Sequence, residues 1–396
     1  MERLAAKSVP GLLPLVDARE FPATADRVYL NSAGIGLVPQ SVQDVALDFA
    51  RAVGTEGTLA YFDRYDQLMT EPRRAAAALF GAPVETIAII TSVSEAISQF
   101  AWWTRPQRGE NVILIDNDCS ATTYPWIRVA EDTGAEIRFV RADDLGKVDP
   151  AEIERLCDQH TSAICLSHVH WESGQRFDLL QISEVARKNH AAFVVDAMHS
   201  TGVLAFSPEE LSGIDLMVSG SFKWMCGFAG SGVAYMNPEV IPKFRPILVG
   251  SRTGDPEPPF AGIVSTEINL PDDARRLEYG SSIAVPRVAF GAAADFAVGV
   301  GLNAITDHVH ALGSRLIEGL GDLGATVVTP VEAKQRAGIV SATFPGRDMS
   351  QLYESLLHER VFTLLRANNI RFSPHHFNTR DDVDEALAAL KGCLAR

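Results

Sequence analysis

The sequence predicts an α/β fold in which helices cover a mostly parallel sheet. From about residue 86, short runs of β-branched and apolar residues alternate with longer stretches that are compatible with helices, as in repeated strand–helix units. The 396 residues suffice for one large and one smaller domain. With 46% hydrophobic and 21% charged residues, the composition is that of a globular protein and excludes a disordered chain or a small disulfide scaffold.

The first elements follow from local periodicity. After an extended segment that ends in VYLNSAG (28–34), Pro39 opens a stretch in which Val42, Ala46 and Phe49 recur at helical spacing. The strands predicted after it are 86–91, 111–116, 136–140, 162–169, 191–197 and 215–221. Ligands bind beyond the carboxyl ends of such strands, so we expect chemistry in the polar residues that directly follow them.

The C-terminal part has a different pattern. Residues 250–282 are rich in Pro, Gly and Asp without periodicity, which predicts a lid or a subunit contact. The elements expected after it are an amphipathic helix over 305–320, strands within 338–344 and 370–374, and a terminal helix from about Asp381. The expected organisation is an N-terminal segment (1–25) packing with the small domain, a large domain (26–290) and a small α+β domain (291–396).

Net charge and cysteine content indicate which binding partners and which cellular compartment to expect. The 35 Lys and Arg against 50 Asp and Glu give a net charge of -15, which repels nucleic acid and anionic lipid, so we expect neither as a partner. No apolar stretch reaches the roughly 20 residues that span a bilayer, and the N-terminus lacks the apolar core of a secretory signal. The 5 cysteines are scattered without a CxxC pair, which favours a reducing cytoplasm over a disulfide framework or a thiolate metal site.

Polar residues follow two neighbouring predicted strands within 191–236. Asp196 and His199 follow one strand, and Ser221 and Lys223 follow the next, so we expect all four at one rim of the sheet. Lys223 lies between two aromatic residues. Desolvation lowers the pKa of a lysine, and the free amine can form a Schiff base with an aldehyde. A carboxylate that faces a pyridine nitrogen keeps that nitrogen protonated, which makes the ring an electron sink.

The order Asp-x-x-His followed by SGSFKWMCGFAGSGVAYM (219–236) resembles the class V aminotransferase family of pyridoxal 5'-phosphate (PLP) enzymes of fold type I. That family includes cysteine desulfurases, selenocysteine lyases, kynureninases and isopenicillin N epimerase-like proteins. The resemblance implies a large domain with a seven-stranded sheet, and a homodimer with active sites at the subunit boundary. It also implies that Lys223 forms the Schiff base with PLP, that Asp196 pairs with the ring nitrogen, and that His199 lies near the phenolic oxygen.

The resemblance also places the remaining cofactor contacts. ITSVSEA (90–96) resembles the phosphate-binding turn of the family, and free N–H groups and hydroxyls at a helix start suit a dianion. Trp171 stands where an asparagine usually contacts the phenolic oxygen, and Cys119 stands where a histidine usually stacks on the ring. The implied cofactor contacts besides Asp196, His199 and Lys223 are Ser92, Val93, Ser94, Cys119, Trp171, Ser221 and, from the neighbouring subunit, Ser281.

Arg371 matches the arginine that binds the substrate α-carboxylate in this family, with Asn31 expected on the same side. Desulfurases of the family carry a mobile-loop cysteine ahead of that arginine, but residues 358–373 contain none, which disfavours persulfide-forming desulfuration. The predicted activity is therefore a C–S β-lyase on cysteine, cystine or a cysteine S-conjugate, with Lys223 removing the α-proton. The alternatives are an epimerase, an aminotransferase, a decarboxylating deaminase, or a scaffold whose cofactor contacts have decayed.

Two further patterns have simpler interpretations. His375 and His376 are adjacent in the sequence, so we expect them to point apart and to make a poor chelate, and we expect no metal site. The aromatic segment TLAYFDRYD (58–66) is expected in the core or at an interface, with a lid over the cofactor as the alternative.

Overall fold

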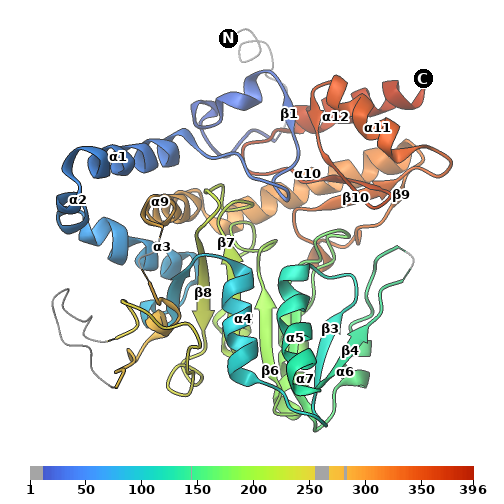
Figure 1. The fold of residues 1–396 in the computed structure, drawn as a ribbon. Helices are drawn as coiled ribbons and strands as arrows, with labels where there is room; N and C mark the ends of the chain where they lie inside the picture. Colours follow the sequence, from blue (N-terminus) through green and yellow to red (C-terminus); the bar gives the residue numbers. More distant parts are fainter. Residues whose placement is uncertain (1–11, 144, 255–266, 281–282) are drawn as a thin grey trace.

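The computed structural model describes residues 12–143, 145–254, 267–280 and 283–396 (Figure 1). Its centre is a seven-stranded sheet in the order β2-β8-β7-β6-β5-β3-β4, parallel throughout except for β8, which runs antiparallel to both neighbours. The strands are β2 (Ile87–Ile90), β3 (Asn111–Ile115), β4 (Glu136–Val140), β5 (Thr161–Ser167), β6 (Ala192–Asp196), β7 (Leu216–Gly220) and β8 (Gly232–Met236). The predicted α/β class is thereby confirmed.

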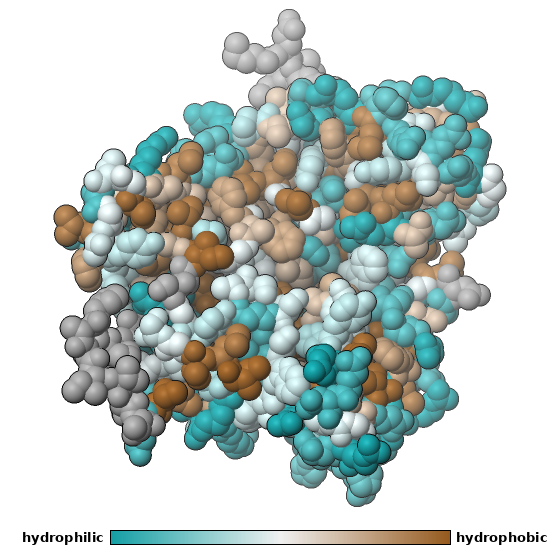
Figure 2. Space-filling view, in the orientation of Figure 1, coloured by the Kyte–Doolittle hydropathy of each residue, from teal (hydrophilic) through white to brown (hydrophobic). Residues whose placement is uncertain are grey.

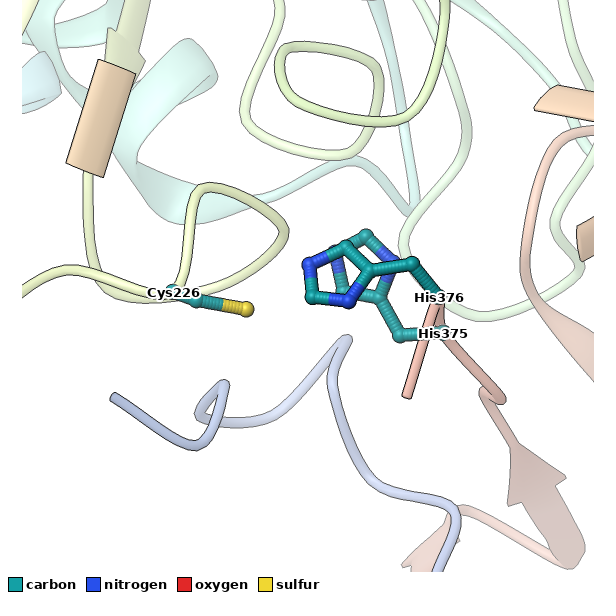
Figure 3. Close-up of side chains that lie close together, drawn as sticks. All are labelled: Cys226, His375 and His376. Atoms are coloured by element: carbon teal, nitrogen blue, oxygen red, sulfur yellow. The ribbon is translucent and has the colours of Figure 1, made fainter. Parts of the chain in front are cut away.

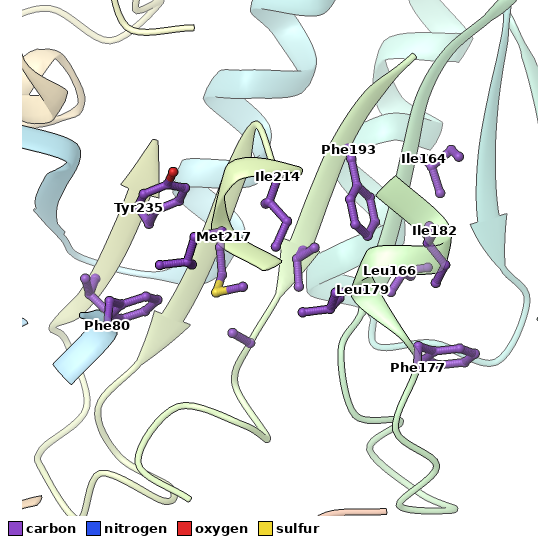
Figure 4. Close-up of a cluster of buried hydrophobic side chains, with 14 of the residues drawn as sticks. Phe80, Ile164, Leu166, Phe177, Leu179, Ile182, Phe193, Ile214, Met217 and Tyr235 are labelled. Atoms are coloured by element: carbon purple, nitrogen blue, oxygen red, sulfur yellow. The ribbon is translucent and has the colours of Figure 1, made fainter. Parts of the chain in front are cut away.

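Helices cover both faces of this sheet because alternate strand residues point to opposite sides. On one face, Phe193 and Val195 of β6 belong to a core that includes α3, α7 and α9 (Figure 4). On the other face, Val194 belongs to a core with α4 and α5. The helices around the sheet are α3 (Glu71–Phe80), α4 (Val93–Thr104), α5 (Ser120–Thr133), α6 (Ala151–Leu156), α7 (Leu179–Lys188), α8 (Pro208–Ser212) and α9 (Ala284–Val300).

A smaller sheet in the order β12-β13-β10-β9 packs with three helices in the C-terminal part. Its elements are α10 (Leu302–Asp322), β9 (Thr326–Val327), β10 (Val340–Thr343), α11 (Met349–His358), β12 (Leu364–Arg366), β13 (Asn369–Phe372) and α12 (Arg380–Leu394). The amphipathic helix and the two strands predicted here are confirmed. Within the described residues, no single helix is long and apolar enough to cross a bilayer. Helices α9 and α10 reach that length and apolar content only when they are taken together, and the angle between them is 75°.

The first described residues, from Leu12 to Leu30, lie on the C-terminal part (Figure 1). Strand β1 (Val28–Tyr29) pairs in parallel with β11 (Val361–Phe362), and Leu30 belongs to the core of the C-terminal part. The backbone N–H of Leu15 donates to the carbonyl of His376 at 2.8 Å. Helices α1 (Gln40–Glu56) and α2 (Thr58–Asp63) follow, and α1 is the helix predicted after Pro39. The domain boundaries themselves remain predictions.

The segment 250–282 is anchored at its end. Glu278 forms an ion pair of 2.8 Å with Arg287 of α9, both side chains being buried, and also accepts a hydrogen bond of 2.9 Å from the N–H of Ile89 in β2. Residues 255–266 and 281–282 lie outside the described residues. The lid or subunit contact predicted for this segment therefore stays a prediction.

Candidate active site

The register of the large sheet brings the predicted residues to one edge. Asp196, the last residue of β6, pairs with β7, while Ile90 at the end of β2 and Gly220 at the end of β7 both pair with Gly232 of β8. The ends of β2 and β7 are therefore level, β6 ends two residues short of β7, and neighbouring strands lie about 4.8 Å apart. Lys223 and the start of α4 follow these ends directly, so the expected convergence at one rim is observed.

The amine of Lys223 lies 3.1 Å from Nε2 of His199. The indole N–H of Trp224 donates to Nδ1 of His199 at 3.2 Å. Because a neutral imidazole carries one N–H, this pattern assigns the hydrogen to Nε2, where it faces the lysine amine as an acceptor. Burial lowers the pKa of His199 well below its usual value. Burial also lowers the pKa of Lys223 to about 8, against the opposing charge of Asp196. The site thus favours the neutral amine that a Schiff base requires.

Asp196 is 4% exposed and accepts two hydrogen bonds. Its Oδ1 accepts from the N–H of Met198 at 2.8 Å, and its Oδ2 accepts from the hydroxyl of Thr122 at 3.3 Å. Burial raises the pKa of Asp196 to about 6, and the nearby carboxylate of Asp118 contributes to the rise. A buried carboxylate of this kind suits a protonated ring nitrogen as its partner. Sequence reasoning missed Thr122, because a threonine within a predicted helix carries no distinctive signal.

The predicted phosphate turn is a helix start. Ser92 is the N-cap of α4, and its hydroxyl accepts from the N–H of Glu95 at 3.2 Å. The side chains of Ser92 and Ser94 are exposed, whereas that of Val93 is buried. The first N–H groups of a helix have no partner within it, so this turn offers both N–H and hydroxyl donors to an anion. Ser281, predicted to reach the phosphate of the neighbouring subunit, lies outside the described residues.

Cys119 and Trp171 lie on loops beside the strand ends. Cys119 is partly buried just before α5, where burial raises its pKa and the charges of Asp196 and Lys223 also influence it. The indole N–H of Trp171 donates to the backbone carbonyl of Asn117 at 2.7 Å. That N–H is therefore engaged with the protein. The roles predicted for both residues toward the cofactor stay predictions.

Ser221 shapes the loop that carries Lys223. It is fully buried, and its hydroxyl lies within hydrogen-bond distance of the carbonyls of Phe228 and Ser231, the second at 3.0 Å. A hydroxyl has one hydrogen, so it donates to one of these two acceptors at a time. Ser221 thus helps to close the loop 222–231, and its predicted contact with the cofactor stays a prediction.

Arg371 and Asn31 present buried polar atoms without partners. Arg371 is 2% exposed, and its Nη1 donates to the carbonyl of Trp171 at 2.5 Å. Its Nε and the Oδ1 of Asn31 have no hydrogen-bond partner among the described residues. The backbone of Asn31 forms an isolated β-bridge with that of Ser373, two residues beyond Arg371. Burial lowers the pKa of Arg371 to about 9, and the charge of Arg366 adds to the effect. Buried polar atoms are rarely left unpaired, so this pair fits a site that binds a polar ligand.

The structure corrects the prediction for His375 and His376. Their ring centroids are 4.1 Å apart, and together with Cys226 they place three ligand atoms within 4.8 Å of one another. The prediction assumed an extended chain with alternating side chains. Strand β13 ends at Phe372, however, and the chain turns at residues 376–377, so adjacent side chains face the same region.

Comparison with known proteins agrees with this site. A family model described as Aminotransferase class-V matches residues 28–385. The chain is 28% identical, over 98% of its length and 97% of the relative, to a probable cysteine desulfurase from Halalkalibacterium halodurans. It is 26% identical, over 92% of its length and 95% of the relative, to the isopenicillin N epimerase of Streptomyces clavuligerus. Among solved structures, the cystine C-S lyase C-DES in complex with its product cysteine persulfide matches with a TM-score of 0.84 at 23% identity, covering 94% of this chain and 99% of that one. Because the family model spans most of the chain, which also carries the expected lysine and aspartate at one rim, the protein belongs to the class-V aminotransferase family of PLP-dependent enzymes.

Proposed function

We propose that the protein is a C–S β-lyase that acts on cysteine, cystine or a cysteine S-conjugate. The observation that carries this proposal is the hairpin ahead of Arg371. Strands β12 and β13 are joined by the two residues Ala367 and Asn368, with Arg366 paired to Asn369. Such a short connection leaves no room for a mobile segment with a catalytic thiol, whereas β-elimination requires no protein thiol. The likeness to C-DES, which is described as a cystine C-S lyase, supports the same choice.

The residues of the site fit PLP. Lys223 provides a buried amine and Asp196 a buried carboxylate for the ring nitrogen. Residues 92–94 provide the helix start for the phosphate. The unpartnered Nε of Arg371 provides a donor for the substrate carboxylate, and the unpartnered Oδ1 of Asn31 provides an acceptor for a donor group of the substrate. When bound, PLP supplies the electron sink that stabilises negative charge on the substrate α-carbon.

Three side chains then direct the reaction. Arg371 holds the α-carboxylate with its planar guanidinium, which orients the amino acid. The amine of Lys223 accepts the α-proton, since burial keeps its pKa near that of a useful general base. His199 contacts that amine and orients it. The C–S bond at the β-carbon breaks with its electron pair leaving on sulfur, and with one water consumed the products are a thiol or persulfide, pyruvate and ammonia.

The products of a single incubation test this proposal. Purified holoprotein with L-cystine or S-methyl-L-cysteine is expected to release pyruvate and ammonia in equal amounts, and Lys223→Ala is expected to release neither above background. Alanine with persulfide would indicate desulfuration. Racemised substrate, or amino transfer that depends on a keto acid, would indicate an epimerase or an aminotransferase. Each of these outcomes without pyruvate contradicts the lyase. A colourless protein that borohydride does not alter would indicate a decayed scaffold.

We further propose a homodimer. Helices α1 and α2 with the residues that follow them expose large apolar side chains (Figure 2), namely Leu47, Leu59, Tyr61, Phe62 and Tyr65. The exposure of 61% for both Leu59 and Phe62 shows that they are not core residues, so of the interpretations considered for 58–66 an interface fits best. Apolar surfaces of this kind mark protein contacts. Light scattering is expected to give the mass of two chains, and Phe62→Glu is expected to shift it toward one.

A further inference from the structure

Three metal-ligating side chains meet at a buried point beside the cofactor site (Figure 3). Cys226 lies in the loop after Lys223, and His375 and His376 lie in the turn after β13. Their exposed fractions are 1%, 0% and 2%, and one ligand atom from each lies within 4.8 Å of the others. Figure 3 shows the sulfur of Cys226 directed toward the two imidazole rings.

Hydrogen bonding leaves imidazole nitrogens available to a metal. Nε2 of His375 lies 2.6 Å from the carbonyl oxygen of Trp224. A carbonyl oxygen only accepts, so Nε2 carries the hydrogen and Nδ1 keeps its lone pair. The Nδ1 atoms of His375 and His376 are both buried and have no partner among the described residues. A backbone carbonyl that accepts from the second ring nitrogen is the usual support of a metal-bound histidine.

The surroundings of the three donors are apolar. Cys226 packs in an apolar cluster with Phe21 and Phe377. Buried ring nitrogens without partners in such a cluster are unfavourable unless a ligand satisfies them.

We propose that Cys226, His375 and His376 bind a zinc ion. Thiolate and imidazole are the ligands that zinc prefers in proteins. Bond lengths of about 2.0 Å to nitrogen and about 2.3 Å to sulfur place tetrahedral ligand atoms about 3.3–3.5 Å apart, so the side chains close by about 1 Å when the metal enters. The thiol releases its proton to solvent as the zinc–sulfur bond forms.

This zinc acts as a clamp and takes no part in the reaction. The N–H of Cys226 donates to the carbonyl of Lys223 at 3.1 Å, and His375 holds the carbonyl of Trp224. His375 follows Arg371 by four positions in the same segment. One ion would therefore tie the loop of the Schiff-base lysine to the strand of the carboxylate-binding arginine. The inference depends on neither the substrate nor the type of reaction.

Metal analysis of the tag-free holoprotein tests the clamp. After dialysis against zinc and then zinc-free buffer, the wild type is expected to keep about one zinc per chain. Cys226→Ser and His376→Phe are expected to lose it while keeping the yellow cofactor, and phenylalanine preserves the ring contacts of position 376 with Phe21 and Phe296. Cys393→Ser, which removes a buried thiol in α12, is the matched control and is expected to keep the metal.

Cobalt(II) provides a second readout that needs no variant to fold. Titration of the zinc-free wild type is expected to produce thiolate-to-cobalt absorption that saturates at about one equivalent and disappears when zinc is added. A folded, yellow wild type that retains less than about a tenth of an equivalent of zinc and shows no such absorption would overturn the proposal. Zinc retained undiminished by both Cys226→Ser and His376→Phe would overturn it as well, because PLP itself or another site would then hold the metal.

Discussion

Gly36 is the position at which a single methyl group should disturb the catalytic loop most directly. Its N–H donates to the carbonyl of Phe222 at 2.8 Å. A Cβ at this position would lie 2.0 Å from the carbonyl oxygen of Lys223 and 3.3 Å from the Cα of Cys226. These are backbone atoms that no rotamer change can move. Gly36→Ala must therefore displace either the N-terminal segment or the loop that carries the lysine.

The expected loss of stability in Gly36→Ala is the sum of two contributions. Overpacking a well-packed site costs about 1–3 kcal/mol, and loss of the hydrogen bond from Gly36 adds about 1 kcal/mol. The free energy of unfolding should thus fall by about 2–4 kcal/mol. If the loop takes up the displacement, a shift of about 1 Å at Lys223 should also lower kcat/KM by about 100-fold.

Urea unfolding, followed by circular dichroism and by PLP absorbance, measures both effects. Gly54→Ala in α1 makes the same chemical change where a Cβ meets nothing within 4 Å. This control is expected to be neutral or more stable by up to about 1 kcal/mol, since alanine favours helices. Equal unfolding midpoints for the two variants, with equal PLP content and activity, would refute the contact between residue 36 and the loop.

Three other predictions concern charge. Burial lowers the pKa of Lys223 to about 8, so the rate of covalent PLP attachment, measured by borohydride trapping, should rise with pH and level off above that value. Asp196→Asn should lower the midpoint of this pH profile, because it removes a charge that raises the pKa of Lys223. A rate that keeps rising up to the ordinary pKa of 10.5 would contradict the burial argument. Arg371→Lys keeps the positive charge but loses the planar guanidinium that forms two hydrogen bonds to a carboxylate, so KM should rise about 10–100-fold with less effect on kcat. An unchanged KM would show that Arg371 does not bind the substrate carboxylate. Arg287→Met removes the 2.8 Å partner of the buried carboxylate of Glu278 and leaves it Arg73 at 4.0 Å and the N–H of Ile89, so the loss in urea unfolding should reach up to about 3–5 kcal/mol. The same change combined with Glu278→Gln should cost less, and a larger loss in the double variant would show that the pair is not the cause.

Much of the catalytic centre could be predicted from sequence because parallel strands end at one edge. Asp196, His199 and Lys223 follow two neighbouring strands, so their convergence needed only the strand pattern. The partners that set their protonation could not be predicted. Trp224 and Thr122 act through hydrogen bonds whose geometry depends on loop conformation and helix rotation, and neither residue type indicates such a role.

The prediction that failed depended on local conformation. Adjacent side chains point apart only in extended chain, and the turn at residues 376–377 brings His375 and His376 together. The contact predicted between Ser221 and the cofactor stays a prediction, since its two carbonyl partners lie seven and ten residues further along the loop and do not decide it. The pairing of β1 with β11 left no trace in the sequence either, since two short strands far apart in the chain share no periodicity.

The pairing of β1 with β11 also bears on when the enzyme becomes competent during synthesis. Val28 emerges from the ribosome well before its partner Val361, because the two lie far apart in the chain. Domains fold as units while the chain grows, and contacts between distant segments form late. The segment that places Gly36 against Lys223 therefore settles only after the strand with Val361 has been made. A nascent chain that stops before this strand would carry the lysine without the surroundings that activate it, so its reactivity toward aldehydes is withheld until β11 is available.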